Sequence, residues 1–499
     1  MSIGPGEDWG RDLKEVGTEV LSTAPRFLWS EAILEFGRAV NAVAVALLLL
    51  ATACNAPQPS ESSTGLGDHD TSSAARAQAQ DPATANADLG QTQQKEELRE
   101  SLQQRSGSSA VENTASLPPP AILKPGTRLT RGTTVRVGPD RLYRKPSEAA
   151  RIAKDGDTIE IDAAVYVGDV AVWPQSNLTL RGVGGRPHLR AGGRSAEGKA
   201  IWVIKGDNTT VENLEFSGTK VGDKNGAGIR LEGTGLVIRN SAFHDNEMGV
   251  LTGRNSDSDV TIENSEFYDN TVDYRKFGRL GHNIYIGEIR SFTLIGSYIH
   301  GAVIGHNVKS RARYNTIQYN RIMDENDGGS SYLIDLPNGG ASYLIGNLFH
   351  QSPKNDNNAM ISYGSEGHKY DERTVYVLSN TFVNDDKDGA FIQTLGKSSV
   401  WALNNLFVGP GLVVRSKDGL LEEKFLAGNV MTANPKFADR NGFDYRLRFG
   451  SPAIDQGIDA GSAQGFELRP RAVYVDPVQT TPRRPNGVLD AGAYEFEGE

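Results

Sequence analysis

One group of residues near the middle of the chain combines side chains that acid–base chemistry uses. Tyr285, Lys309 and Asp335 each stand third in a short apolar segment whose second residue is Ile or Val. Side chains alternate between the two faces of a strand, so the second residue would point inward and the third outward. With the segments aligned as neighbouring strands, Lys309 lies between Tyr285 and Asp335. The full outward column reads Arg230, Leu251, Tyr285, Lys309, Asp335, Ser362 and Gln393.

Two histidines are expected beside this column. The pairs His282-Asn283 and His306-Asn307 begin the segments that hold Tyr285 and Lys309, and each pair follows a glycine. One strand apart, the two imidazoles would stack next to Lys309. The alternative interpretation is structural, with Asn283 and Asn307 supporting turns while the histidines pack between them.

Two arginines add positive charge at the same place. Arg311 and Arg313 follow Lys309 closely in a chain whose formal net charge is −10. A local cationic patch can attract an anion even when the whole protein is acidic. The patch therefore predicts a substrate that carries carboxylates.

These residue types suit β-elimination on a uronic-acid polymer. The reaction requires that the carboxylate is neutralised, that the C5 proton is removed and that the leaving oxygen is protonated. We expect Lys309 to be the base, with a pKa lowered by its cationic neighbours, and Tyr285 or His306 to supply the proton. The expected substrate-binding residues are Arg311, Arg313, His282, Asn283 and Asn307, with one of the two arginines clamping the carboxylate.

Two other functions remain open. In a glycoside hydrolase, Asp335 would be the acid and Glu288 or Asp324 a second carboxylate, at a separation of roughly 5 to 9.5 Å. In a non-catalytic carbohydrate-binding or envelope-scaffold protein, Lys309 would simply form an ion pair with Asp335. An ordered cleft that converges on Lys309 would favour an enzyme.

An internal repeat indicates which fold positions these side chains. Segments such as Val211-Glu-Asn-Leu-Glu-Phe and Ile262-Glu-Asn-Ser-Glu-Phe recur along the chain. Their asparagines are Asn213, Asn240, Asn264, Asn320, Asn347, Asn380 and Asn405. Stacked copies would form an amide ladder at a bend and an aromatic column inside, as in a parallel β-helix with rungs about 4.8 Å apart. The two-residue hairpin turns of a β-sandwich and the blade signature of a propeller are not seen.

We therefore predict an all-β, right-handed parallel β-helix over residues 126–499. A short helix beginning near Lys145 would cap its first rung. This layout resembles that of secreted bacterial β-helix proteins of the pectin-lyase-like group, including the closing segments Asn434-Pro-Lys-Phe and Gly450-Ser-Pro-Ala.

A second resemblance concerns the segment around Lys309. Val308-Lys309-Ser310, followed by Asn315-Thr-Ile-Gln-Tyr-Asn320, resembles the Lys-Ser segment of family-six polysaccharide lyases, the alginate lyases and chondroitinase B. That resemblance implies Lys309 as the Brønsted base, an arginine of the next rung as the acid, and calcium as a possible cofactor. The chain departs from this pattern at Asp335, which stands where the arginine is expected and would hold Lys309 protonated.

Possible calcium ligands lie in two acidic turns. Asp324-Glu-Asn-Asp-Gly and Asn384-Asp-Asp-Lys-Asp-Gly offer oxygen atoms of the kind that calcium prefers, without the spacing of an EF-hand. We assign no residue as a metal ligand, and calcium remains only a possible cofactor.

The N-terminal residues of the sequence predict that the protein is exported from the cytoplasm. Residues 1–54 contain an apolar run too short to span a membrane, followed by Leu50-Ala-Thr-Ala-Cys54, which resembles a lipobox with Cys54 as the lipidated residue. Residues 55–125 have the composition of a disordered linker. These features predict a secreted or outer-membrane lipoprotein that acts on an acidic polysaccharide. The acidic composition argues against a nucleic-acid partner.

Overall fold

The computed structural model describes residues 132–498. Residues 1–131, which carry the predicted signal peptide, Cys54, the predicted linker and the first residues of the predicted β-helix domain, lie outside the described residues. None of the helices within 132–498 is long and apolar enough to cross a bilayer.

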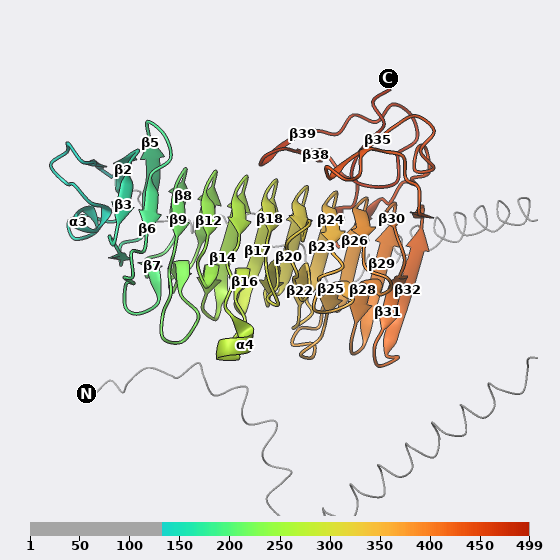
Figure 1. Ribbon diagram of the computed structural model, residues 1–499, viewed down its shortest axis with the longest axis horizontal. Helices are drawn as coiled ribbons and strands as arrows, with labels where there is room; N and C mark the ends of the chain where they lie inside the picture. Colours follow the sequence, from blue (N-terminus) through green and yellow to red (C-terminus); the bar gives the residue numbers. More distant parts are fainter. Residues whose placement is uncertain (1–131, 499) are drawn as a thin grey trace, which may run out of the picture. The chain divides into compact units, whose positions relative to one another are not determined.

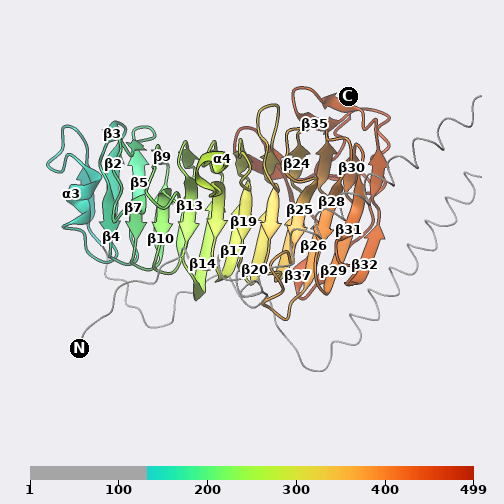
Figure 2. The same cartoon turned by 60° about the horizontal axis from the view of Figure 1, so that its bottom comes forward.

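Three long parallel sheets run side by side and form a parallel β-helix (Figure 1, Figure 2). Sheet A comprises β1 (Thr134–Val137), β2 (Thr158–Asp162), β5 (Thr179–Val183), β8 (Thr209–Glu212), β11 (Leu236–Arg239), β14 (Asn255–Glu263), β17 (Ile289–Ile295), β20 (Tyr314–Gln318), β23 (Ala341–Ile345), β26 (Thr374–Leu378), β29 (Ser398–Leu403) and β32 (Leu421–Ala427). Sheet B comprises β3 (Val165–Val167), β6 (His188–Arg190), β9 (Glu215–Ser217), β12 (Ala242–His244), β15 (Glu266–Tyr268), β18 (Tyr298–His300), β21 (Arg321–Met323), β24 (Leu348–Gln351), β27 (Thr381–Asn384), β30 (Leu406–Val408) and β33 (Val430–Thr432). Sheet C comprises β4 (Ala171–Trp173), β7 (Ala200–Ile204), β10 (Ala227–Leu231), β13 (Met248–Thr252), β16 (His282–Ile286), β19 (Val308–Ser310), β22 (Ile334–Leu336), β25 (Ala359–Tyr363), β28 (Ala390–Thr394) and β31 (Leu412–Ser416).

Aromatic and aliphatic side chains stack in the interior, one from each rung. Phe216, Phe243 and Phe267 lie opposite one another in sheet B, with successive ring centroids 4.9 and 4.7 Å apart and nearly parallel planes. These distances match the spacing of neighbouring strands. The predicted aromatic column is therefore present, because a constant register places equivalent residues directly above one another.

The asparagines of the repeat occupy two adjacent columns, which corrects the single ladder expected from sequence. Asn213, Asn240 and Asn264 have positive φ and form the turn between sheets A and B. The later asparagines stand one position further along and form a buried amide ladder, with Nδ2–Oδ1 distances of 2.9 to 3.0 Å. Its members are Asn320, Asn347, Asn380, Asn405 and Asn429. Earlier rungs place Ser241, Ser265 and Ser297 in that column.

The N-terminal end carries the expected helix, α3 (Pro146–Ala150), which contacts β1 and β4 (Figure 1). Its residues Pro146, Ala149 and Ala150 are buried, and the two alanines join the main core. Strand β1 comes before this helix and pairs in parallel with β2, so the helix does not precede the first strand of sheet A. A second short helix, α4 (Tyr274–Phe277), lies in the connection between β15 and β16.

The C-terminal segment covers part of the outer surface of the solenoid. It contains three antiparallel pairs, β34 (Phe437–Asp439) with β35 (Asp444–Leu447), β36 (Ser462–Ala463) with β37 (Phe466–Glu467), and β38 (Ala472–Val475) with β39 (Gln479–Pro482). Its Tyr445 and Tyr474 pack with Leu406 and Val408 of sheet B, and its Leu468 packs with residues of sheet A. The segment thus covers outer faces of sheets A and B, on the later rungs.

Candidate active site on sheet C

The outward column of sheet C has the register that the sequence predicts. Tyr285 of β16 lies opposite Lys309 of β19, and Lys309 lies opposite Asp335 of β22. The preceding residues Val308 and Ile334 are fully buried in the core. Alternation between inward apolar and outward polar side chains therefore brings the three candidate residues together on consecutive rungs.

Lys309 is held between two carboxylates. Its Nζ lies 3.1 Å from Asp335 Oδ2 and 3.1 Å from Glu366 Oε1, and only 8% of the residue is exposed. Burial works to lower the pKa of Lys309, but the charges of Asp335 and Glu366 outweigh it, and the pKa is raised above its ordinary value. The expectation of a lowered pKa is wrong, whereas the expected ion pair with Asp335 is present.

Glu366 was not expected at this site. It lies in the loop that follows β25, fifty-seven positions after Lys309, and its backbone N–H donates to the Pro337 carbonyl. Its side chain is 46% exposed. Burial favours the neutral acid, yet hydrogen bonds and charges from Arg311 and Lys309 dominate and lower the pKa of Glu366 to about 2. A carboxylate from a loop distant in sequence therefore binds Lys309 and Arg311.

Arg311 makes the closest contacts with that carboxylate. Its Nη1 donates to Glu366 Oε2 at 2.6 Å and its Nη2 donates to Glu366 Oε1 at 2.8 Å. The same guanidinium donates to Asn338 Oδ1 at 2.9 Å and, through Nε, to the Tyr285 hydroxyl at 3.2 Å. A bidentate contact between an arginine and a carboxylate is strong and directional. We call Lys309 and Arg311 the carboxylate clamp.

Arg313 faces a different partner. Its guanidinium binds Glu372, with Nη2–Oε1 at 2.8 Å, and Glu372 also accepts from the Tyr314 hydroxyl at 3.2 Å. Of the two arginines predicted to hold a carboxylate, Arg311 is the one beside Lys309.

The two histidines stack as predicted but are buried. The rings of His282 and His306 lie 4.8 Å apart, and the His306 backbone N–H donates to His282 Nδ1 at 2.9 Å. His306 Nε2 is 3.4 Å from Asp335 Oδ2. Burial lowers the pKa of His306 to about 4 and that of His282 well below its ordinary value. Both rings are therefore neutral at pH 7.

Asn283 and Asn307 do not face the surface, which corrects their placement as substrate contacts. Both are fully buried, and Asn283 Nδ2 donates to Asn307 Oδ1 at 2.8 Å. They continue a ladder that begins with Asn246 and Asn270 at the turn between sheets B and C. Their position agrees with the structural interpretation, in which they support turns and hold the adjoining histidines.

The two residues considered as the second carboxylate for hydrolysis, Glu288 and Asp324, bind other partners. Glu288 binds Lys369 Nζ at 2.5 Å and accepts from Asn338 at 3.4 Å. Asp324 is buried, accepts from the backbone N–H groups of Ser330 and Ser352, and has a pKa raised to about 6, chiefly by burial. The carboxylate that accompanies Asp335 at the clamp is Glu366.

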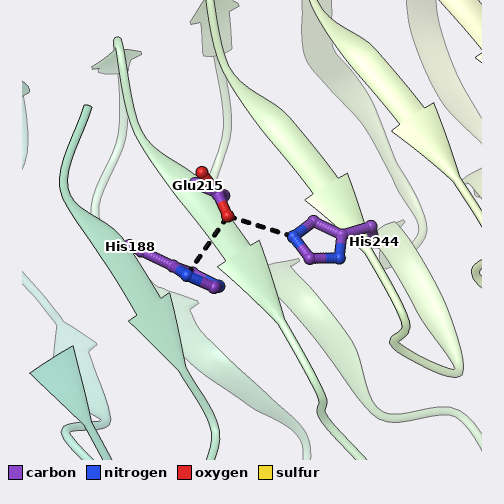
Figure 3. A group of neighbouring side chains, drawn as sticks. All are labelled: His188, Glu215 and His244. Carbon is purple, nitrogen blue, oxygen red and sulfur yellow. Dashed lines mark hydrogen bonds and ion pairs between the residues drawn. The ribbon is translucent and has the colours of Figure 1, made fainter. Parts of the chain in front are cut away.

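The two acidic turns do not gather calcium ligands. In the first, Asp324 is buried and Asp327 pairs with Lys354. In the second, Asp385 binds His350 and Arg440, while Asp388 accepts from Asn358. Within residues 132–498, the one group of three metal-ligating side chains is His188, Glu215 and His244 on sheet B (Figure 3). The sequence alone could have indicated this group, because each of its residues is next to an apolar residue of a sheet B strand. These apolar residues are Leu189, Phe216 and Phe243, which lie opposite one another.

A cavity of about 580 Å³ lies between the C-terminal segment and sheet B. Arg321, Phe443, Tyr474 and Tyr494 are among its lining residues. None of the residues of the clamp lines it, so the chemistry-bearing groups and this cavity belong to different parts of the surface.

One protein-family model agrees with the fold. The family described as right-handed β-helix region matches residues 194–422, which confirms the predicted hand of the solenoid. No curated protein matches the chain. Among solved structures, pectate lyase Pel9A is 12% identical with a TM-score of 0.46, and the match covers 74% of this chain and 98% of that one. The pectin methylesterase from Aspergillus niger is 10% identical with a TM-score of 0.30, covering 66% and 93%. A point mutant of the family-six alginate lyase AlyGC is 14% identical with a TM-score of 0.28, covering 73% of this chain and 56% of that chain.

Proposed function

We propose that this right-handed β-helix protein binds an acidic polysaccharide on the outer face of sheet C and cleaves it by β-elimination. The main support for the proposal is the position of Glu366, whose carboxylate is bound by Arg311 and Lys309. A uronate residue offers the same group. The clamp would hold the substrate carboxylate once the Glu366 side chain has moved aside.

Elimination breaks the C5–H and C4–O bonds of the uronate and forms a double bond between C4 and C5. Negative charge spreads onto the carboxylate as the C5 proton leaves, so two cations fixed beside that carboxylate stabilise the transition state. Lys309 and Arg311 fulfil this role. The raised pKa of Lys309 keeps its ammonium charged, which suits charge neutralisation rather than removal of a proton.

Tyr285 is the group that we propose moves the proton. Its hydroxyl accepts from Arg311 Nε at 3.2 Å and is therefore next to the clamp. The step starts from the Tyr285 phenolate, formed by release of the hydroxyl proton to solvent, and its negative charge lies beside the Arg311 guanidinium. The phenolate oxygen takes the C5 proton and becomes a neutral hydroxyl. The same oxygen can return that proton to the departing sugar oxygen. His306 is not assigned to this proton transfer, because it is buried and its Nε2 lies 3.4 Å from Asp335 Oδ2.

A non-catalytic carbohydrate-binding protein is the second candidate. This function is favoured by the burial of the ion pair between Lys309 and Asp335, because Asp335 is 2% exposed and the pKa of Lys309 is raised. Such a protein would hold uronates with the same clamp and release them unchanged.

The test incubates the full chain with a panel of uronate polymers and follows ultraviolet absorbance, which rises when a double bond conjugated to a carboxylate forms. We expect a rise that Lys309→Ala and Tyr285→Phe abolish and that Arg313→Ala leaves in place. Retention of polymer without absorbance or new reducing ends would establish binding alone. New reducing ends without absorbance would assign hydrolysis to Asp335 and Glu366. No retention of any uronate polymer, by the wild type or by a Glu366→Gln variant, would contradict the proposal.

We also propose that Cys54 carries a lipid that tethers the protein to the outer membrane. The lipobox-like segment before Cys54 and the presence of a single cysteine in the chain support this. Labelling cells with a radioactive fatty acid tests it. The wild type should be labelled and Cys54→Ser should not, whereas equal labelling of the two would contradict the anchor.

A further inference from the structure

Three side chains on the outer face of sheet B converge on one point. His188 of β6, Glu215 of β9 and His244 of β12 come from three consecutive strands, and Figure 3 shows both imidazoles turned toward the carboxylate between them. Their side chains are 21%, 27% and 13% exposed, respectively, so the group is shielded but reachable from solvent. It lies on a different sheet from the carboxylate clamp.

One carboxylate oxygen faces both rings. His188 Nδ1 and His244 Nε2 are each 3.2 Å from Glu215 Oε1, and the three possible ligand atoms lie within 4.8 Å of one another. Around a tetrahedral metal ion with bonds of about 2.0 to 2.1 Å, neighbouring ligand atoms are separated by about 3.3 Å. Two of the three separations already have this length.

The outer nitrogen of each ring is anchored by a second partner. His188 Nε2 is 2.7 Å from the Ser217 hydroxyl, and His244 Nδ1 is 2.7 Å from Asp245 Oδ2. Histidines that bind metals are commonly oriented in this way, with the second nitrogen bonded to a carboxylate or another acceptor. Tyr268 on the next rung stacks against His244 at 4.7 Å and further fixes that ring.

We propose that His188, Glu215 and His244 form a binding site for one divalent transition-metal ion of the zinc class. Two imidazoles and one carboxylate suit zinc and its first-row neighbours, whereas calcium and magnesium prefer oxygen ligands throughout. Three protein ligands leave a fourth position for water, as in zinc sites that perform chemistry. The ion would also link three consecutive rungs of the solenoid.

The test measures zinc binding to the metal-free full chain by calorimetry, together with zinc X-ray absorption of the loaded protein. We expect one zinc per chain, a spectrum with two imidazole ligands, and a higher melting temperature with zinc than without it. Glu215→Gln keeps the size of the side chain and should weaken zinc binding at least about tenfold, as should His244→Gln.

His300→Gln is the matched control. His300 lies on the same face of sheet B and its Nε2 is 3.4 Å from Glu266 Oε1, but among residues 132–498 that pair belongs to no group of three metal ligands. It should bind zinc as the wild type does. A melting curve of each variant without zinc confirms that it is folded. Zinc retained equally by His188→Gln, Glu215→Gln and His244→Gln, or no zinc bound by the folded wild type, would overturn the site.

Discussion

The carboxylate of Glu366 lies across the guanidinium of Arg311, with both oxygens bonded, although fifty-five positions separate the two residues. The loop after β25 thus reaches back over the strand that carries Lys309. Its Tyr370 hydroxyl donates to the Arg311 carbonyl at 2.8 Å and fixes the loop at a second point. The protein therefore supplies its own ligand to the clamp.

Replacing Arg311 by lysine tests the importance of its bidentate contact with a carboxylate. Lysine keeps the charge but cannot donate two parallel hydrogen bonds to one carboxylate. We expect the dissociation constant for a uronate oligomer, measured by calorimetry, to rise roughly 10- to 100-fold, which corresponds to about 1.4 to 2.8 kcal/mol. Arg313→Lys is the control, because Arg313 is bound to Glu372, and it should change the constant little. Equal losses in the two variants would place the substrate elsewhere.

Low pH should weaken the ion pairs of Glu366 with Lys309 and Arg311 over a defined pH range. The pKa of Glu366 is lowered from 4.5 to about 2, so the ionised side chain stabilises the fold above pH 4.5 and this contribution is lost as the pH falls toward 2. The difference in melting temperature between the wild type and Glu366→Gln should therefore shrink from pH 5 to pH 2. A difference that stays constant over this range would show that the ion pair does not contribute to stability.

The buried amide ladder should be important for stability. Asn347 Nδ2 donates to Asn380 Oδ1 and to the Ile317 carbonyl, and its Oδ1 accepts from Asn320. Asn347→Ala removes these buried hydrogen bonds, at a cost of roughly 2 to 4 kcal/mol. Chemical denaturation of this variant should show that loss. The exposed Asn358→Ala should cost much less, and similar losses for both would mean that the ladder has no special role.

The sequence predicts the solenoid and its outward column because both follow from short-range rules. Alternation along each strand decides which side chains point inward, and the apolar residue before Lys309 aligns it with Tyr285 and Asp335. The asparagine ladder was misaligned by one position because Asn213 is three residues before its Phe, whereas Asn347 is two residues before Phe349. Both spacings allow a turn, and only the register of sheet B separates them.

Other parts of the site depend on contacts that no local pattern encodes. Glu366 reaches Lys309 through a loop whose path is decided by its packing on distant rungs, so its effect on the pKa of Lys309 could not be anticipated. The burial of Asn283 follows from a neighbouring ladder rather than from its own segment. His188 and His244 could have been aligned through the apolar residues beside them, since each flanks an inward residue of sheet B.

Affinity for a uronate polymer in the wild type and in Glu366→Gln tests the central claim most directly, with Glu372→Gln as the matched control. If Glu366 occupies the position of a substrate carboxylate, its neutral substitute competes less well for Lys309 and Arg311. We predict that Glu366→Gln binds the polymer about tenfold more tightly than the wild type and that Glu372→Gln binds as the wild type does. Unchanged or weaker binding by Glu366→Gln would contradict the claim that the clamp is the carboxylate-binding site.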